Sequence, residues 1–209
     1  MLDAKSIAAG AQVALFGAGG LARELASSIL HLSATPENVR FVVDAPFYDE
    51  GFNWNGIVME LASSDTRELV IALGSPDARH VIAQRMGGWA NAKSLCLGKV
   101  GHSTRMGRGV VIAEGARVTS DVILGDGCLI QMDSTVAHDC VLGQEVNVNP
   151  GARVNGHVIL GDRVTIGAQA SIREGIQIVS DVMVGMGAAV VKDINEPGIY
   201  AGNPARRIK

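Results

Sequence analysis

The chain has 209 residues, enough for one medium-sized domain or two small ones with a substantial core. Aromatic residues make up 4% of the chain and glycine contributes 26 residues, so the core must be built mainly from aliphatic side chains. The net charge of −3 provides no basic surface for nucleic acid. Three cysteines do not make a disulfide framework, which indicates a reducing compartment.

The stretch "IAAGAQVALFGAGGLA" near the N-terminus could be mistaken for a secretory signal. It lacks a basic region before the apolar part, carries Gln12 and runs directly into a glycine turn. We therefore interpret it as a buried strand followed by a loop. No apolar run approaches the roughly 20 residues that cross a bilayer, so we expect a soluble, cytoplasmic protein.

The first half of the chain alternates strands and helices. "QVALFGAGGLARELASSIL" predicts a buried strand, a glycine turn and an amphipathic helix. "VRFVVDAP" predicts a second strand that ends at Asp44, and "ELVIALGSPDARHVIAQRM" a third strand with another helix. This alternation favours a small, Rossmann-like parallel α/β sheet. We place the domain boundary at Gly87-Gly88, which gives domains of residues 1–88 and 89–209.

"GAGGLA" satisfies a loose dinucleotide fingerprint, in which Gly17 and Gly19 let the backbone approach a phosphate at a helix N-terminus. Asp44 follows where a ribose-binding acid would lie, and "ALGS" could line the same crevice. With fewer than 100 residues the domain is too small for a full dinucleotide fold. We therefore favour the phosphate of a nucleotide-sugar over a structural turn or NAD(P). The predicted substrate-binding residues of this half are Gly17, Gly19, Gly20, Leu21, Asp44, Gly74 and Ser75.

The second half repeats every six residues. From Val100 to Val190 each sixth residue is a sizeable aliphatic residue or methionine, and small or β-branched residues recur two positions earlier. This period is typical of a parallel β-helix, in which three hexads make one triangular coil. Residues 100–191 would then form about five coils. The series is uninterrupted, so we expect no long loop to leave them.

The same pattern decides where the polar residues of "STVAHDCVLG" lie. Cys128 and Cys140 fall in the small interior register, which predicts packed, reduced thiols. His138 and Asp139 fall outside both interior registers, which predicts that they lie on the surface of the coil.

Five stretches in succession, "GAGGLARE", "FVVDAP", "IALGSPDAR", "AHDCVLG" and "GIYAGNPARRI", carry a family resemblance over residues 12–209. The chain resembles the hexapeptide-repeat sugar O- and N-acyltransferases. These include relatives of sialic-acid O-acetyltransferase and the nucleotide-amino-sugar N-acetyltransferases of bacillosamine and perosamine synthesis. The resemblance implies a left-handed β-helix, a homotrimer, acetyl-CoA in the groove between neighbouring helices, and a nucleotide-sugar held by the N-terminal domain.

His138 matches the catalytic histidine of this family, and Asp139 matches the acidic residue after it. Acyl transfer from a thioester needs a base to take the proton of the attacking amine or hydroxyl. Imidazole suits this task, a neighbouring carboxylate can orient it, and backbone N–H groups would stabilise the oxyanion. The alternative is that both residues form a solvated corner of the coil.

Other residues are carried over from the resemblance. Asn147 stands where some relatives have a histidine that contacts acetyl-CoA, and Gln131 stands where the family has an acceptor-side asparagine. The three glycines among the predicted cofactor contacts could instead be corner residues, and the basic side chains could simply be solvated. The remaining predicted cofactor contacts are Gly156, Gly167, Ala168, Gly185, Met186, Lys192 and Arg206, with Arg207 beside the last.

Four functions remain open. The leading hypothesis is acetyl-CoA-dependent acetylation of the amine of a nucleotide-linked amino sugar, and the second is O-acetylation of sialic acid or another sugar hydroxyl. A metal-dependent hydrolyase like the β-helical carbonic anhydrases would need several closely spaced histidines. His102, His138 and His157 lack that spacing in the sequence, so we expect no metal. A non-catalytic scaffold is the fourth alternative.

Overall fold

The computed structural model describes residues 1–33, 35–63 and 69–209. The chain divides into two compact units, Met1–Leu97 and Gly98–Lys209. The predicted boundary after residue 88 precedes this division. The intervening residues belong to the first unit because Trp89 and Ala92 pack in its core and strand β7 (Leu95–Cys96) pairs with β1 (Leu2–Asp3).

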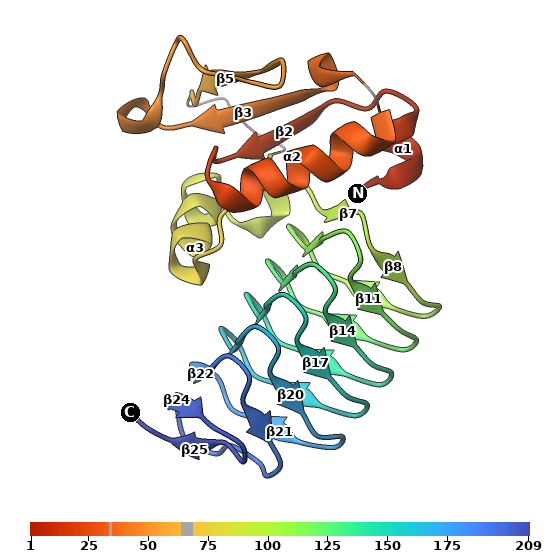
Figure 1. Ribbon diagram of the computed structural model, residues 1–209, viewed down its shortest axis with the longest axis vertical. Helices are drawn as coiled ribbons and strands as arrows, with labels where there is room; N and C mark the ends of the chain where they lie inside the picture. Colours follow the sequence, from red (N-terminus) through yellow and green to blue (C-terminus); the bar gives the residue numbers. More distant parts are fainter. Residues whose placement is uncertain (34, 64–68) are drawn as a thin grey trace. The chain divides into compact units, whose positions relative to one another are not determined.

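The first unit is built on a five-stranded sheet in the order β4-β5-β3-β2-β6. Figure 1 shows its strands β5, β3 and β2 side by side. Strands β2, β3 and β6 are parallel, as predicted for this half of the chain, and β5 adds a fourth parallel strand that was not predicted. The predicted third strand begins at Glu68, which lies outside the described residues. The strands are β2 (Val13–Phe16), β3 (Val39–Val43), β4 (Asn53–Trp54), β5 (Ile57–Leu61) and β6 (Val70–Ile71); the helices are α1 (Ala4–Ala8), α2 (Gly20–Ser33) and α3 (Pro76–Arg85), with single 3-10 turns at Pro36–Asn38, Ala45–Phe47 and Trp89–Asn91.

Burial explains these elements. All four residues of β2 are buried, as expected for a central parallel strand that is covered on both faces. Helix α2 buries Ala22, Leu25, Ala26 and Ile29, whose spacing places them on one face. The side chain of Ser75 caps α3 by accepting a hydrogen bond from the backbone N–H of Ala78.

The hairpin β4–β5 is an element that our sequence analysis did not predict. Asn55 and Gly56 join its antiparallel strands and both have positive φ, 52° and 85°. Two positive φ values are what a two-residue type I′ turn requires, and Asn-Gly is its preferred sequence. The signal for this hairpin was therefore present in "NWNGIV".

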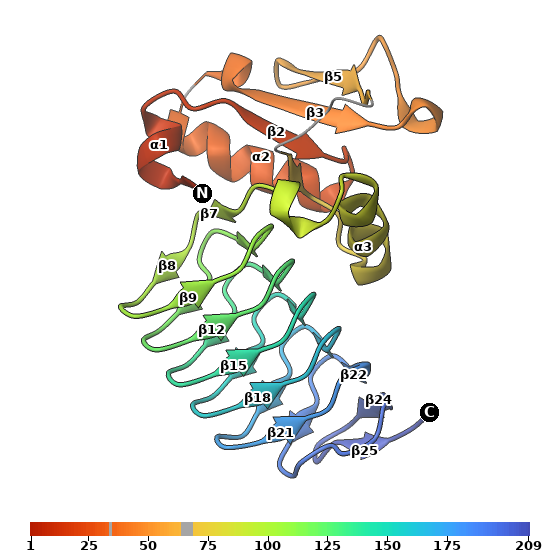
Figure 2. The same ribbon diagram turned by 180° about the vertical axis from the view of Figure 1, so that it is seen from behind.

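The second unit is a parallel β-helix with a strand every six residues, as predicted (Figures 1 and 2). Its strands form three faces, and successive rungs of each face lie three hexads apart in the sequence. Face 1 contains β8 (Lys99–Val100), β11 (Arg117–Val118), β14 (Thr135–Val136), β17 (Arg153–Val154), β20 (Ser171–Ile172) and β23 (Ala189–Val190). Face 2 contains β9 (Arg105–Met106), β12 (Ile123–Leu124), β15 (Val141–Leu142), β18 (Ile159–Leu160) and β21 (Gln177–Ile178). Face 3 contains β10 (Val111–Ile112), β13 (Leu129–Ile130), β16 (Asn147–Val148), β19 (Thr165–Ile166) and β22 (Val182–Val184).

Both predicted interior registers fill the coil. The large aliphatic residues from Ile112 to Val190 are all buried, whereas Val100 and Met106, at the start of the coil, are half-buried. The small register from Val110 to Ala188 is buried throughout. Its two thiols behave as predicted: Cys128 donates a hydrogen bond to the carbonyl of Gly143, and Cys140 donates one to the carbonyl of Asn155.

The corners of the coil follow the same period. From residue 103 to 187 every sixth residue has a positive φ, and glycine occupies six of these positions. Residues with side chains occupy the others, including Asp121, Asp139, His157 and Asp181. Polar residues are tolerated there because most of these side chains face solvent and short polar groups adopt left-handed backbone more readily than branched ones.

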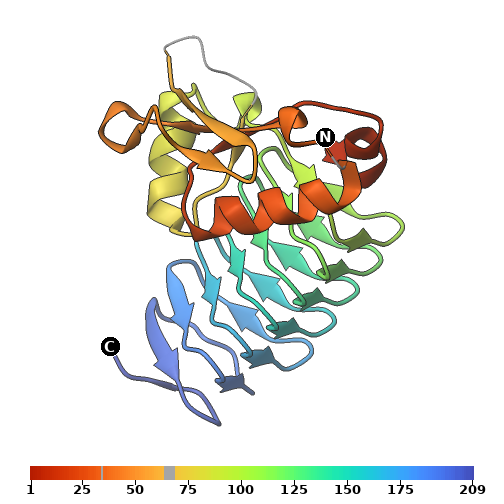
Figure 3. The same ribbon diagram turned by 45° about the horizontal axis from the view of Figure 1, so that its top comes forward.

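No long loop leaves the coil between residues 100 and 190, a range that the structure describes in full (Figure 3). Beyond it, β24 (Gly198–Ala201) pairs in parallel with β22, and β25 (Arg206–Arg207) folds back on β24. Across the described parts of the chain, no helix combines the length and apolar character that crossing a bilayer requires.

Candidate functional site

The first cluster of functional side chains lies where face 1 turns into face 2. His138 and Asp139 follow β14, and Gly156 and His157 follow β17 one coil further on. Because β14 and β17 pair in register, Gly156 lies next to His138 and His157 lies next to Asp139. We call His138, Asp139, Gly156 and His157 the histidine edge. His138 and Asp139 are exposed, as predicted from the registers.

Asp139 holds the imidazole of its neighbour. Nδ1 of His138 lies 2.8 Å from Oδ2 of Asp139, a hydrogen-bond distance, and the two side chains are 50% and 47% exposed. A carboxylate can only accept, so Nδ1 carries the proton and Nε2 of the neutral ring keeps its lone pair. The arrangement therefore presents an oriented proton acceptor to solvent.

Gly156 makes room for this ring. A Cβ atom built on Gly156 would lie 2.6 Å from Cε1 and 2.8 Å from Nε2 of His138, closer than non-bonded atoms approach. The imidazole thus rests against the bare backbone of the next coil. The sequence predicted Gly156 as a cofactor contact or a corner residue, and the structure gives it a different neighbour, the predicted base itself.

His157 was not among our predicted site residues. Its Nε2 lies 3.8 Å from Oδ2 of Asp139, and its ring meets that of His138 edge to face with centroids 5.1 Å apart. The expectation that the histidines lack close spacing is therefore wrong for His138 and His157. They are far apart in sequence, but the coil brings positions three hexads apart into contact, and His157 follows Asp139 by three hexads.

A second group lies on another edge, where face 3 turns into face 1. We call Gln131, Asn149, Gly167, Ala168, Gly185 and Met186 the amide edge. Nε2 of Gln131 donates a hydrogen bond of 2.7 Å to Oδ1 of Asn149 on the next coil. A Cβ atom on Gly167 would lie 2.6 Å from the backbone of Gly185, so packing between coils alone explains that glycine. Met186 is 82% exposed.

The remaining predicted cofactor contacts are scattered. Asn147, on β16, is only 2% exposed, so the structure lends no support to its predicted contact with a ligand. Lys192 follows β23 and Arg206 lies on β25, and neither is buried. Neither belongs to the histidine edge or the amide edge.

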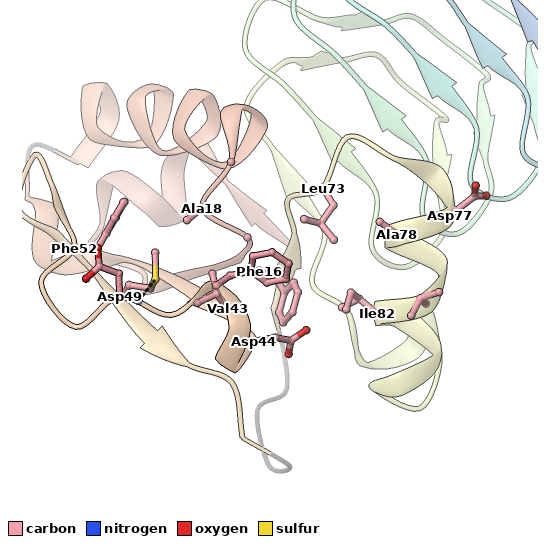
Figure 4. Close-up of a pocket in the computed structure, with 15 residues that line it drawn as sticks. Phe16, Ala18, Val43, Asp44, Asp49, Phe52, Leu73, Asp77, Ala78 and Ile82 are labelled. Carbon is pink, nitrogen blue, oxygen red and sulfur yellow. Dashed lines mark hydrogen bonds between the residues drawn. The ribbon is translucent and has the colours of Figure 1, made fainter.

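The first unit contains a cavity of about 800 Å³ at the carboxyl ends of its parallel strands (Figure 4). Aromatic and aliphatic side chains dominate the lining, among them Phe16 and Phe52, and Asp44, Asp49 and Asp77 supply carboxylates. The crevice beyond strand carboxyl ends is where open α/β sheets bind ligands. The predicted site residues that line it are Gly17, Gly19 and Asp44.

Asp44 is not a free acid in this cavity. Its Oδ2 lies 2.9 Å from Nη1 of Arg85, which also lies over the ring of Phe16 at 5.3 Å. Spacing along the sequence did not reveal this ion pair. Four predicted residues, Gly20 and Leu21 in the first turn of α2 and Gly74 and Ser75 before α3, are not part of the lining.

Comparisons with known proteins agree with the architecture. The family described as the GMPPB C-terminal domain matches residues 90–184, while no curated protein matches the chain. The acetyltransferase domain of PglB from Neisseria gonorrhoeae is 28% identical over 94% of this chain and 99% of that domain, with a TM-score of 0.80. A second structure of that domain contains acetyl coenzyme A. The chain thus resembles the acetyltransferases of nucleotide-linked sugars in sequence and in fold.

Two further solved structures share the fold at 24% identity. One is PerB from Caulobacter crescentus, crystallised with CoA and GDP-perosamine, with a TM-score of 0.79 over 95% of this chain and 97% of that chain. The other is WeeI from Acinetobacter baumannii, with a TM-score of 0.79 over 94% of this chain and 99% of that chain. Their coverage shows that both units of this chain, and not the coil alone, have structural counterparts.

Proposed function

We propose that the protein transfers the acetyl group of acetyl-CoA to the amine of a nucleotide-linked amino sugar, with His138 as general base. The observation that carries the proposal is the 2.8 Å contact between Nδ1 of His138 and Oδ2 of Asp139 on an exposed edge of the coil. The bound molecules of two structural neighbours, acetyl coenzyme A in one and CoA with GDP-perosamine in the other, support the choice of substrates.

The chemistry follows from the orientation of the ring. The sugar amine attacks the thioester carbonyl, a C–N bond forms, and the C–S bond to CoA breaks. Nε2 of His138 takes the proton that the nitrogen loses, and this proton can then pass to the departing thiolate. Asp139 keeps Nδ1 protonated and stabilises the positive imidazolium that forms on the way.

The position of the two edges favours an assembly. The histidine edge and the amide edge border face 1 from opposite sides, so one chain does not bring the proposed base next to the predicted cofactor residues of the amide edge. We infer a homotrimer of left-handed coils, as in the family, in which neighbouring chains supply the two edges and acetyl-CoA lies between them. In that arrangement a complete site requires a second copy of the chain.

The cavity of the first unit suits the nucleotide part of the acceptor. Phe16 and Phe52 can contact a planar base, and the backbone N–H groups at the start of α2 favour an anion such as a phosphate. The family resemblance and GDP-perosamine in a structural neighbour support a nucleotide-sugar rather than a free sugar.

Release of the CoA thiol tests the proposal. The protein is incubated with acetyl-CoA and a panel of UDP-, GDP-, dTDP- and CMP-linked amino sugars. Replacing the base, His138→Ala, should lower kcat/KM by about 10²- to 10⁴-fold. The matched control is His102→Ala, which removes an exposed histidine from an earlier coil and should leave the rate unchanged. Full activity of His138→Ala, or no thiol release with any acceptor, would refute the proposal.

A further inference from the structure

The histidine edge combines three metal-ligating groups that acyl transfer does not need together. One nitrogen of His138, one nitrogen of His157 and one carboxylate oxygen of Asp139 all lie within 4.8 Å of one another. Within the described residues, no other cluster of this kind occurs. The sequence did not reveal it because its members come from two coils.

The distances suit a small cation. Three atoms no more than 4.8 Å apart have a common point that is at most about 2.8 Å from each of them. A zinc ion binds imidazole nitrogen and carboxylate oxygen at about 2.0–2.2 Å, so each ligand atom needs to move by less than about 1 Å. Closing that difference takes small rotations of side chains. All three side chains are about half exposed, at 50%, 47% and 56%, so they are free to make them.

We propose that His138, Asp139 and His157 form an open three-ligand site for a first-row divalent transition metal ion such as zinc, and that the bound ion switches off the base. Two imidazoles and one carboxylate favour zinc, nickel or copper over magnesium and calcium, which prefer oxygen ligands. The three side chains are about half exposed in the single chain, which leaves the remaining coordination positions to water.

The inhibition follows from the number of free nitrogen lone pairs on imidazole. A neutral ring has one nitrogen with a free lone pair, and its other nitrogen carries the proton. Once the ion takes that lone pair, the ring has none left to accept the proton of an attacking amine. Binding at Nδ1 also replaces the hydrogen bond to Asp139, because the ion then stands between the two groups. This inhibitory half of the proposal rests on the proposed function, whereas metal binding itself does not.

Calorimetric titration of the untagged, full-length protein with zinc chloride tests the binding. We expect one zinc ion per chain for the wild type, and at least a tenfold weaker affinity for His157→Asn. The control His102→Asn, on an earlier coil, should bind like the wild type. Thermal unfolding without metal establishes that each variant is folded. Cobalt(II) provides a second readout, since its visible absorption reports a shell that contains imidazole. No zinc binding by the wild type, or equal binding by His157→Asn, would overturn the proposal.

Activity tests the inhibition in a separate arm. Zinc should lower acetyl transfer by the wild type at least tenfold, and EDTA should restore it. The ratio of rates with and without zinc should be much closer to one for His157→Asn, whatever its own rate. An uninhibited, zinc-loaded wild type would overturn the switch. If zinc binds but no acceptor is acetylated, the metal site stands and the proposed function fails, so the two failures are distinguishable.

Discussion

Replacing Gly156 by alanine should disable the proposed base without unfolding the coil. Gly156 is not among the residues with positive φ, so its backbone accepts a side chain. What forbids the methyl group is the imidazole of His138, whose Cε1 would lie 2.6 Å from the new Cβ. The effect should therefore be on the position of the ring.

The magnitude follows from this distance. Ordinary van der Waals contact begins at 3.4 Å, so the imidazole must move by about 1 Å. A displacement of about 1 Å from reacting geometry can cost about 100-fold in rate, equivalent to about 2.7 kcal/mol of activation free energy. The ring is half exposed and can swing towards solvent, so we expect the free energy of unfolding to change by less than about 1 kcal/mol.

The assay is a double-mutant cycle on kcat/KM. Gly156→Ala should lower acetyl transfer about 100-fold in the wild-type chain and have no further effect on the residual rate of His138→Ala, because the clash needs the imidazole. Denaturant unfolding of each variant separates loss of rate from loss of fold. Wild-type activity of Gly156→Ala, or an equal loss in both backgrounds, would refute the reasoning.

Other predictions concern stability. Burial, followed by the charge of Asp139, raises the pKa of the Cys140 thiol to about 11, so between pH 9 and 11 the thiol loses its proton more readily in the unfolded state. Denaturant titrations across this range should show the wild type losing up to about 3 kcal/mol more stability than Cys140→Ser. An equal change of stability with pH in the two proteins would contradict this. Hydrogen bonds of 2.6 and 2.8 Å from Arg163 lower the pKa of Asp181, and the pair is exposed. Asp181→Asn should therefore lower the free energy of unfolding by less than about 1 kcal/mol near pH 7, and this difference from the wild type should vanish as pH falls through the lowered pKa. A larger loss of unfolding free energy would show that Asp181 has a role beyond the ion pair. Gly17 has a φ of 114°, and a Cβ atom there would lie 2.9 Å from the side chain of Leu73. Thermal unfolding of Gly17→Ala should therefore show a loss of about 1–3 kcal/mol in the free energy of unfolding. An unchanged melting temperature would argue against backbone strain at this position.

The coil could be predicted almost completely because its physics is local and periodic. A narrow interior accepts large aliphatic and small residues at fixed positions, so the registers in the sequence reappear as buried rungs. The surface position of His138 and Asp139 followed from the same registers. Burial of Cys128 and Cys140 followed as well, because both fall in the small one.

What could not be predicted depends on contacts between segments far apart in the chain. The ion pair of Asp44 with Arg85 joins the end of β3 to the end of α3, and no period in the sequence relates the two. The first unit extends past residue 88 because Trp89 packs in its core, which composition does not reveal. Two other features that the predictions missed could have been read from the sequence. The dipeptide Asn55-Gly56 encodes the hairpin, and the offset of three hexads between Asp139 and His157 encodes their proximity.

The register of the stacked rungs also governs how this chain can change in length. Removing a whole coil leaves every remaining pair of strands in alignment, whereas deleting one residue turns the following rungs inside out and exposes their aliphatic side chains. The β-helix can therefore be shortened or lengthened only by whole coils. Because the histidine edge takes all its members from two consecutive coils, coils above and below it can be gained or lost while its geometry persists.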